Sequence, residues 1–109
     1  MEVDLKDFEG LDLRVGEIVK VEPVKGSDRL FLMEVDIGDV RGVRRTVAGL
    51  RPWYKAEELI GRKVIFLANL EEATIRGVKS QGMILAAQDK DTVALLTVDK
   101  ETVNGAKIR

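Results

Sequence analysis

The chain has 109 residues and a net charge of −1, from 18 basic and 19 acidic side chains. This length suits one domain with its own hydrophobic core. The absence of Cys excludes disulfides and Cys-based zinc sites, and the absence of His removes the commonest general base and metal ligand. We therefore expect no cofactor, no metal and no enzymatic activity.

No apolar run approaches the ~20 residues that a membrane span needs, and the acidic N-terminus does not resemble a signal peptide. We expect a cytoplasmic protein without a membrane partner. The charges are unevenly distributed, since residues 41–55 contain five basic side chains and no acid. Such a segment can bind a polyanion, although solvated surface is the commoner explanation.

The first half of the chain predicts an arm followed by three strands. Residues 1–11 form an extended arm or a short helical turn whose apolar side chains need a partner. Residues 13–22 predict a long first strand, bulged beside Gly16. Residues 30–37 alternate cleanly and predict the second strand, and residues 44–50 predict the third.

The second half predicts a short helix and further strands. Residues 56–60 form the helix, because acids occupy its first turn and Gly61 ends it. The apolar run 64–68 predicts a central fourth strand, residues 69–79 a long connection, and residues 83–88 a buried fifth strand. Residues 89–91 predict a hairpin turn, from which residues 93–98 return as a sixth strand, and residues 106–108 predict a tail strand.

Three strands, a helix and two more strands are the order of an all-β, five-stranded OB-fold barrel, and the helix argues against an SH3-like barrel. Residues 1–109 would form one domain with a core of about residues 11–88. The arm, residues 1–10, and the tail, residues 89–109, extend that core.

Residues 76–87 are a glycine-punctuated polar loop that leads into an apolar strand. Arg76 and Lys79 supply charge for phosphate oxygens. Ser80 and Gln81 can bond RNA, or they can cap the backbone of their own turn. Met83 either fills the core or lies under a base.

Motifs along nearly the whole chain resemble the tRNA-binding domain family of OB-folds. They are LDLRVG at 11–16, GSDRL at 26–30, VDIG at 35–38, VAG at 47–49, EELIG at 57–61, ANL at 68–70, GVKSQGMILAA at 77–87 and NGAKI at 104–108. The family includes free-standing homodimers, C-terminal domains of methionyl-tRNA synthetases and parts of multi-synthetase cofactors.

The resemblance implies non-catalytic, structure-specific tRNA binding that assists an aminoacyl-tRNA synthetase, the methionyl enzyme first, in trans or as a subunit. Ser80 and Met83 match the family's Ser-x-Gly-Met segment, and Arg29 matches its basic residue after the first turn. Asn69 either binds RNA or holds a turn. The candidate tRNA-binding residues are Arg29, Arg45, Asn69, Arg76, Lys79, Ser80, Gln81 and Met83.

The chain has few aromatic residues, which favours recognition of RNA by shape and phosphates over base stacking. Trp53 and Tyr54 are the candidates for stacking, or they anchor their loop to the barrel. Apolar residues of the arm and tail predict a homodimer interface made by Val3, Leu5, Phe8, Val98, Val103 and Ile108. The alternative function is a secretion-associated chaperone of the same fold that binds unfolded or peptide segments.

Overall fold

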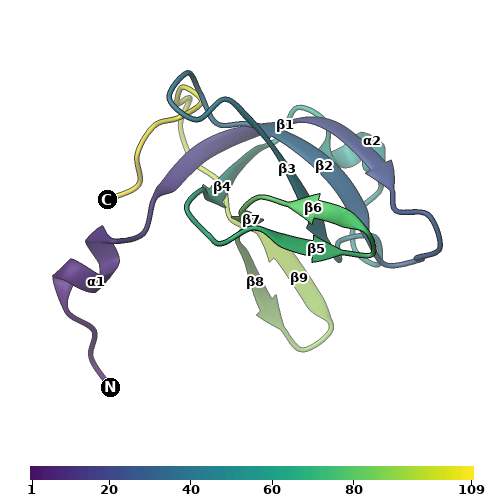
Figure 1. The fold of residues 1–109 in the computed structure, drawn as a ribbon, viewed down its shortest axis with the longest axis horizontal. Coiled ribbons are helices and arrows are strands. Elements are labelled where there is room, and N and C mark those ends of the chain that lie inside the picture. The colour runs from purple at the N-terminus through teal and green to yellow at the C-terminus, as the bar shows by residue number, and fades with distance from the viewer.

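A computed structural model describes residues 1–109, and a five-stranded antiparallel sheet curls into a barrel at its centre (Figure 1). The sheet order is β3-β2-β1-β4-β7, and its strands are β1 (Leu13–Pro23), β2 (Phe31–Asp36), β3 (Val43–Ala48), β4 (Lys63–Leu67) and β7 (Met83–Ile84). Helix α2 (Ala56–Leu59) lies between β3 and β4 in the chain. The predicted OB-fold is confirmed. No helix is long and apolar enough to cross a membrane.

The long strand β1 belongs to both halves of the barrel. Its residues 17–23 pair with β2, and its residues 13–17 pair with β4. The register with β2 shifts between Ile18 and Lys20, so the bulge lies at Val19 and not beside Gly16, which pairs in regular register with Val64 of β4.

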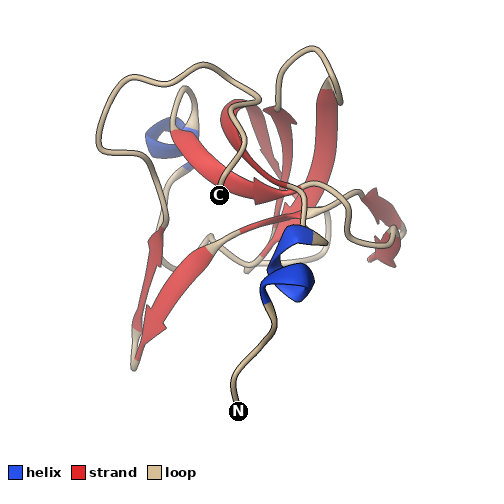
Figure 2. Cartoon of the chain, turned by 90° about the vertical axis from the view of Figure 1, so that its left-hand side faces the viewer, coloured by secondary structure: helices blue, strands red, loops and turns tan.

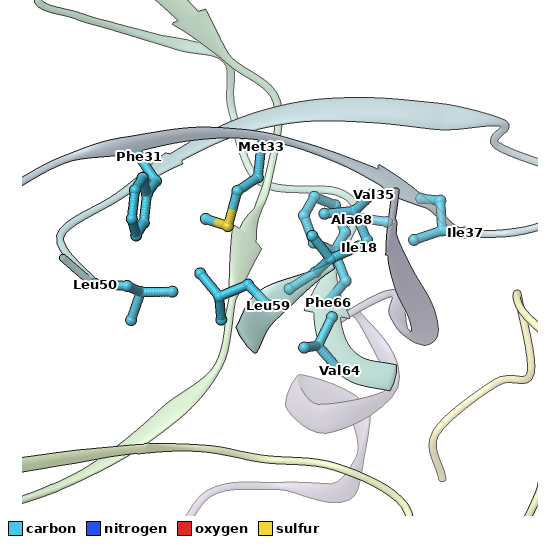
Figure 3. Packing of buried hydrophobic residues seen from close by; sticks show 10 residues of the cluster. All are labelled: Ile18, Phe31, Met33, Val35, Ile37, Leu50, Leu59, Val64, Phe66 and Ala68. Carbon is cyan, nitrogen blue, oxygen red and sulfur yellow. The ribbon is translucent and has the colours of Figure 1, made fainter. Parts of the chain in front are cut away.

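The barrel is filled by ten buried side chains that point towards one another (Figure 3). Leu59 extends from α2 into this cluster and is fully buried, which explains why a four-residue helix is retained there. The cluster consists of Ile18, Phe31, Met33, Val35, Ile37, Leu50, Leu59, Val64, Phe66 and Ala68.

One hairpin was not predicted, whereas the hairpin turn expected at residues 89–91 is confirmed. The connection 69–79 contains β5 (Ala73–Ile75), which pairs with β6 (Val78–Ser80). The predicted strand 83–88 divides at Leu85 into β7 and β8 (Ala86–Asp89), and β8 pairs with β9 (Thr92–Leu95). All four residues of β8 are exposed, Met83 of β7 is also exposed, and none of residues 83–88 is fully buried, so the prediction of a buried fifth strand is wrong.

The division at Leu85 has a hydrogen-bonding cause. Leu85 N–H donates to the Ile65 carbonyl at 2.9 Å, while the Leu85 carbonyl accepts from Leu96 N–H at 3.2 Å. The chain therefore leaves β4 at this residue and pairs with the strand that follows. The β8–β9 hairpin projects from the barrel in Figure 1.

The arm and the tail both contact the first part of the barrel. Helix α1 (Leu5–Glu9) confirms the predicted helical turn in the arm. It lies at one side of the molecule in Figure 1 and in front of the barrel in Figure 2, and its Phe8 packs against the barrel. The predicted tail strand is reduced to one bridge between Lys107 and Arg14. Gly105 N–H donates to the Val15 carbonyl at 2.7 Å, and Val15 N–H donates to the Ala106 carbonyl at 2.9 Å. The tail thus covers an edge of β1 that β2 leaves free.

Candidate nucleic-acid interface

Residues 80–82 close the barrel against β3, and we call this contact the seam. Gln81 N–H donates to the Arg45 carbonyl at 2.8 Å, and Arg45 N–H donates to Gln81 Oε1 at 3.3 Å. Ser80 is 5% exposed, and its Oγ accepts from Val47 N–H at 3.1 Å. One backbone hydrogen bond and two side-chain acceptors, Gln81 Oε1 and Ser80 Oγ, thus join the loop to β3 where a regular ladder is absent.

The seam requires glycine at position 82. Its φ is +105°, and a Cβ there would lie 2.5 Å from the Leu67 carbonyl oxygen and 2.6 Å from the Phe66 ring. The Gly82 carbonyl accepts from Thr46 Oγ1 at 2.9 Å, and Thr46 is 1% exposed. Gly82 therefore lets the loop come close enough to the core to bond β3.

The three uncharged polar candidates for tRNA binding use their side chains inside the protein. These are Ser80 and Gln81 at the seam and Asn69 after β4. Asn69 Oδ1 accepts from Asp12 N–H at 2.8 Å, and Asn69 Nδ2 donates to the Gly10 carbonyl at 2.7 Å. Contact of these three side chains with RNA stays a prediction, and the structure gives each of them an intramolecular partner.

Four candidate cations are exposed on segments that contact one another: Arg29, Arg45, Arg76 and Lys79. Arg45 is joined to Gln81 at the seam, and Lys79 precedes the seam in β6. Arg76, at the tip of the β5–β6 hairpin, donates through Nη1 to the Gly26 carbonyl at 3.3 Å. Arg29 lies on the same loop as Gly26. We call this side of the barrel the seam face.

Two other arginines of the basic segment 41–55 are bonded within the fold. Arg41 bonds Asp12 through Nε at 2.7 Å. Arg51 donates to the Ser27 carbonyl, and its guanidinium lies 5.8 Å from the centre of the Phe31 ring. Of these three arginines, Arg45 lies at the seam, while the guanidinium groups of Arg41 and Arg51 are bonded to other parts of the fold.

An apolar groove of about 260 Å³ lies beside the seam. Met83 lines it and is 42% exposed, so its side chain is not core filling. Ile75 of the hairpin and Val47 of β3 form other parts of the wall. Glu71 is the one charged side chain in the lining. The groove thus adjoins the exposed cations of the seam face.

The two candidate stacking residues are hydrogen-bonded to the β8–β9 hairpin. Trp53 Nε1 donates to the Asp91 carbonyl at 2.6 Å, and the Tyr54 hydroxyl accepts from Leu95 N–H at 3.2 Å. Arg29 and Arg62 lie over these rings, at 5.9 Å and 5.2 Å from the ring centres. In this structure both aromatic residues anchor neighbouring segments.

Sequence patterns did not identify the charge cluster around Asp12. Its carboxylate accepts from Arg14 Nε at 2.9 Å, Arg41 Nε at 2.7 Å and Lys107 Nζ at 3.1 Å. Burial raises the pKa of Asp12, but the hydrogen bonds from Lys107, Arg41 and Arg14 outweigh it and lower the pKa overall. Because the partners lie 2, 29 and 95 residues away in sequence, a local pattern does not show the cluster.

The six candidate dimer-interface residues separate into two groups. Val3, Leu5 and Val103 are 69%, 69% and 74% exposed. Phe8, Val98 and Ile108 pack instead against a small core cluster of their own barrel, formed by Leu13, Val15, Ile65 and Leu67. A second groove, of about 290 Å³, lies between the arm and the tail and is lined by Phe8, Glu9, Leu11, Lys107, Ile108 and Arg109. No group of three or more acids is arranged to hold a metal ion.

Comparison with known sequences gives matches over almost the whole chain. It is 52% identical over 107 residues to a methionine–tRNA ligase of Thermococcus kodakarensis, covering 98% of this chain and 14% of that protein. It is 50% identical over 108 residues to a methionine–tRNA ligase of Methanosarcina mazei, covering 98% of this chain and 15% of that protein. The chain therefore spans about one seventh of the length of these relatives.

Solved structures share the fold along its full length. A MetRS-related protein from Pyrococcus horikoshii superposes with a TM-score of 0.91 at 35% identity, covering 100% of both chains. The chaperone CsaA from Picrophilus torridus also gives 0.91, at 31% identity, covering 99% of this chain and 100% of that one. The family model described as "Putative tRNA binding domain" matches residues 13–107. The chain therefore belongs to the tRNA-binding domain family.

Proposed function

We propose that this chain is a non-catalytic tRNA-binding protein of the cytoplasm that binds folded tRNA through the seam face. The observation that carries the proposal is the grouping of the exposed cations Arg29, Arg45 and Lys79 on segments joined by hydrogen bonds, one of which Arg76 makes to the Gly26 carbonyl. Exposed cations can bind phosphate oxygens, which supply most of the affinity of protein–nucleic acid contacts.

The chemistry of the seam face favours recognition of RNA shape. Trp53 and Tyr54 already donate or accept hydrogen bonds within the protein, so neither is free to act as a mobile stacking group. Met83 and the apolar groove offer contact area to a sugar or a base edge. Ser80, Gln81 and Asn69 hold the seam and the β4 junction in place. Phosphate contacts with little stacking are typical of proteins that bind structured RNA.

We also propose that the chain acts as a homodimer that assists a methionyl-tRNA synthetase, in trans or as a subunit. Exposed Val3 and Leu5 of the arm and Val103 of the tail leave apolar surface that a second copy would cover. The sequence identity with methionine–tRNA ligases supports a connection with that enzyme. Light scattering at micromolar concentration tests the dimer, and a monomeric mass contradicts it.

A chaperone function is the second candidate, and the structural similarity to CsaA proteins favours it. The apolar groove would then take a peptide segment instead of RNA. Suppression of the aggregation of a model client, without tRNA binding, would establish this function and replace the first.

A salt series with a matched pair of variants tests the RNA site. Lys79→Gln removes an exposed cation of the seam face. Lys100→Gln removes an exposed cation from a different segment, the one whose Thr102 carbonyl accepts a hydrogen bond from Lys63. We expect Lys79→Gln to weaken binding of unfractionated tRNA several-fold and to reduce the salt slope by about 1. Lys100→Gln should leave both unchanged. Equal effects of the two variants would refute the site.

A further inference from the structure

The tip of the β5–β6 hairpin has an unusual backbone. Ile75 pairs with Val78, so Arg76 and Gly77 form a two-residue turn. Their φ angles are +52° and +78°, which is the type I′ pattern that favours Asn-Gly or Gly-Gly. A long side chain at the first position carries a steric cost that Asn or Gly largely avoids. Such costs are commonly retained where the side chain has a function.

The Arg76 side chain joins the hairpin to the loop between β1 and β2, residues 24–29. Its Nη1 donates to the Gly26 carbonyl at 3.3 Å. On the other side of this loop, Arg51 donates to the Ser27 carbonyl. Ser27 Oγ accepts from Arg29 N–H at 3.2 Å, which ties down the loop from within. Two arginines from separate elements therefore hold adjacent carbonyl groups of one loop.

The loop and the hairpin also share an apolar cluster. Val24, at the start of the loop, is buried with Leu32 and Val47. Ile75 and Val78, which flank the hairpin turn, pack against the same cluster. The two segments are thus in contact below Arg76, and its hydrogen bond closes the outer end of that contact.

We propose that Arg76 is a positioning residue: it fixes loop 24–29 against the hairpin so that Lys25 and Arg29 face RNA phosphates at a constant separation. This inference rests on the proposed tRNA-binding function. Lys25 and Arg29 are both exposed on the loop. Holding them before binding reduces the conformational entropy that is lost when RNA arrives.

A second turn provides a charge-matched control. Lys90, in the β8–β9 turn, is the one non-glycine residue other than Arg76 that has a positive φ, at +53°. It is exposed and lies on the other hairpin. Arg76→Asn and Lys90→Asn each remove one positive charge and one unfavourable side chain from the left-handed region. Both variants should have a thermal midpoint equal to or above that of the wild type.

Filter binding with unfractionated tRNA then separates the two variants. We expect Arg76→Asn to weaken binding about tenfold, because two cations lose their fixed positions. Lys90→Asn should change the affinity less than twofold, a change within ordinary surface effects. Equal losses of affinity would mean that net charge alone matters and would overturn the proposal. A lower midpoint for Arg76→Asn would assign Arg76 a purely structural role and overturn it as well.

A double-mutant cycle distinguishes positioning from direct phosphate contact. Lys25→Gln should weaken binding in the wild type but add little in the Arg76→Asn background, because Lys25 is then no longer held in place. If the fold-losses of tRNA affinity caused by Lys25→Gln and Arg76→Asn multiply in the double variant, the two side chains act independently and the proposal is overturned. The proposed function itself is tested separately. It would be refuted if the wild-type protein bound tRNA no better than an unstructured RNA of equal length. The role of Arg76 would be refuted if the Arg76→Asn variant bound tRNA with the affinity of the wild type.

Discussion

Asp12→Asn should destabilise the protein strongly, because it neutralises the centre of a charge cluster. The Asp12 carboxylate is the shared partner of Arg14, Arg41 and Lys107. Its side chain is 9% exposed, and the cluster joins the start of β1 to the β2–β3 turn and the tail. Asn would present an NH2 group to three donors and would leave their positive charges without a counterion.

The size of the effect follows from burial. Removing one partner of a buried ion pair costs about 3–5 kcal/mol. The three basic side chains are 19%, 33% and 49% exposed, so solvent recovers part of that loss. We expect the free energy of unfolding to fall by about 2–3 kcal/mol, which corresponds to a lowering of the thermal midpoint of roughly 10–20 °C.

Urea denaturation at pH 7 measures this change, with Asp99→Asn as the control. Asp99 is an exposed acid in the segment after β9, and its replacement should change the unfolding free energy by less than about 0.5 kcal/mol. If Asp12→Asn is no more damaging than Asp99→Asn, the cluster contributes nothing measurable and the reasoning fails.

The remaining predictions concern pH, the seam and the tail. Because the pKa of Asp12 is lowered in the folded state from 3.8, its contribution is present above that value and is lost as pH falls through the folded pKa. The stability difference between wild type and Asp12→Asn should therefore narrow below about pH 4 in acid denaturation, and a constant difference would contradict this. Ser80→Ala leaves the Val47 N–H without its acceptor and should lower the free energy of unfolding in urea by about 1–3 kcal/mol. Ser80→Thr, which keeps a hydroxyl, is the control. Equal stability of Ser80→Ala and the wild type would show that Ser80 does not hold the seam together. Gly82→Ala should prevent barrel closure, seen as loss of a cooperative thermal transition, since its Cβ would lie 2.5 Å from a backbone oxygen. Deletion of residues 104–109 should raise hydrogen exchange at Val15 above that of strand β4, and unchanged exchange would show that the tail does not protect β1.

Periodic burial explains why most of the barrel could be predicted from the sequence. Strands β1, β2 and β4 each bury one or both faces, so their apolar residues alternate or run together as the strand period requires. Helix α2 was predicted from acids in its first turn and Gly61 after its end. The hairpin β5–β6 has strands of three residues, too short for a recognisable period. Its Arg76-Gly77 turn also departs from the usual Asn-Gly signal.

The site was harder to predict than the fold, because pairings distant in sequence decide which polar groups are free. Ser80 and Gln81 look like loop residues in the sequence, yet they bond Val47 and Arg45 at the seam. Asn69 was given two possible roles, and the structure shows its side chain bonded to the residues before β1. The sequence does not distinguish an exposed cation from one that is bonded within the fold. Arg45 is exposed, whereas Arg51 donates to the Ser27 carbonyl.

Competition between RNAs tests the central claim most directly. Labelled tRNA bound to the wild-type protein is challenged with unlabelled tRNA or with an unstructured RNA of equal length, at one fixed salt concentration. Recognition by shape at the seam face predicts that unlabelled tRNA displaces the label at a concentration at least tenfold lower than the unstructured RNA does. Equal displacement by the two RNAs would show binding to charge alone and would contradict the claim.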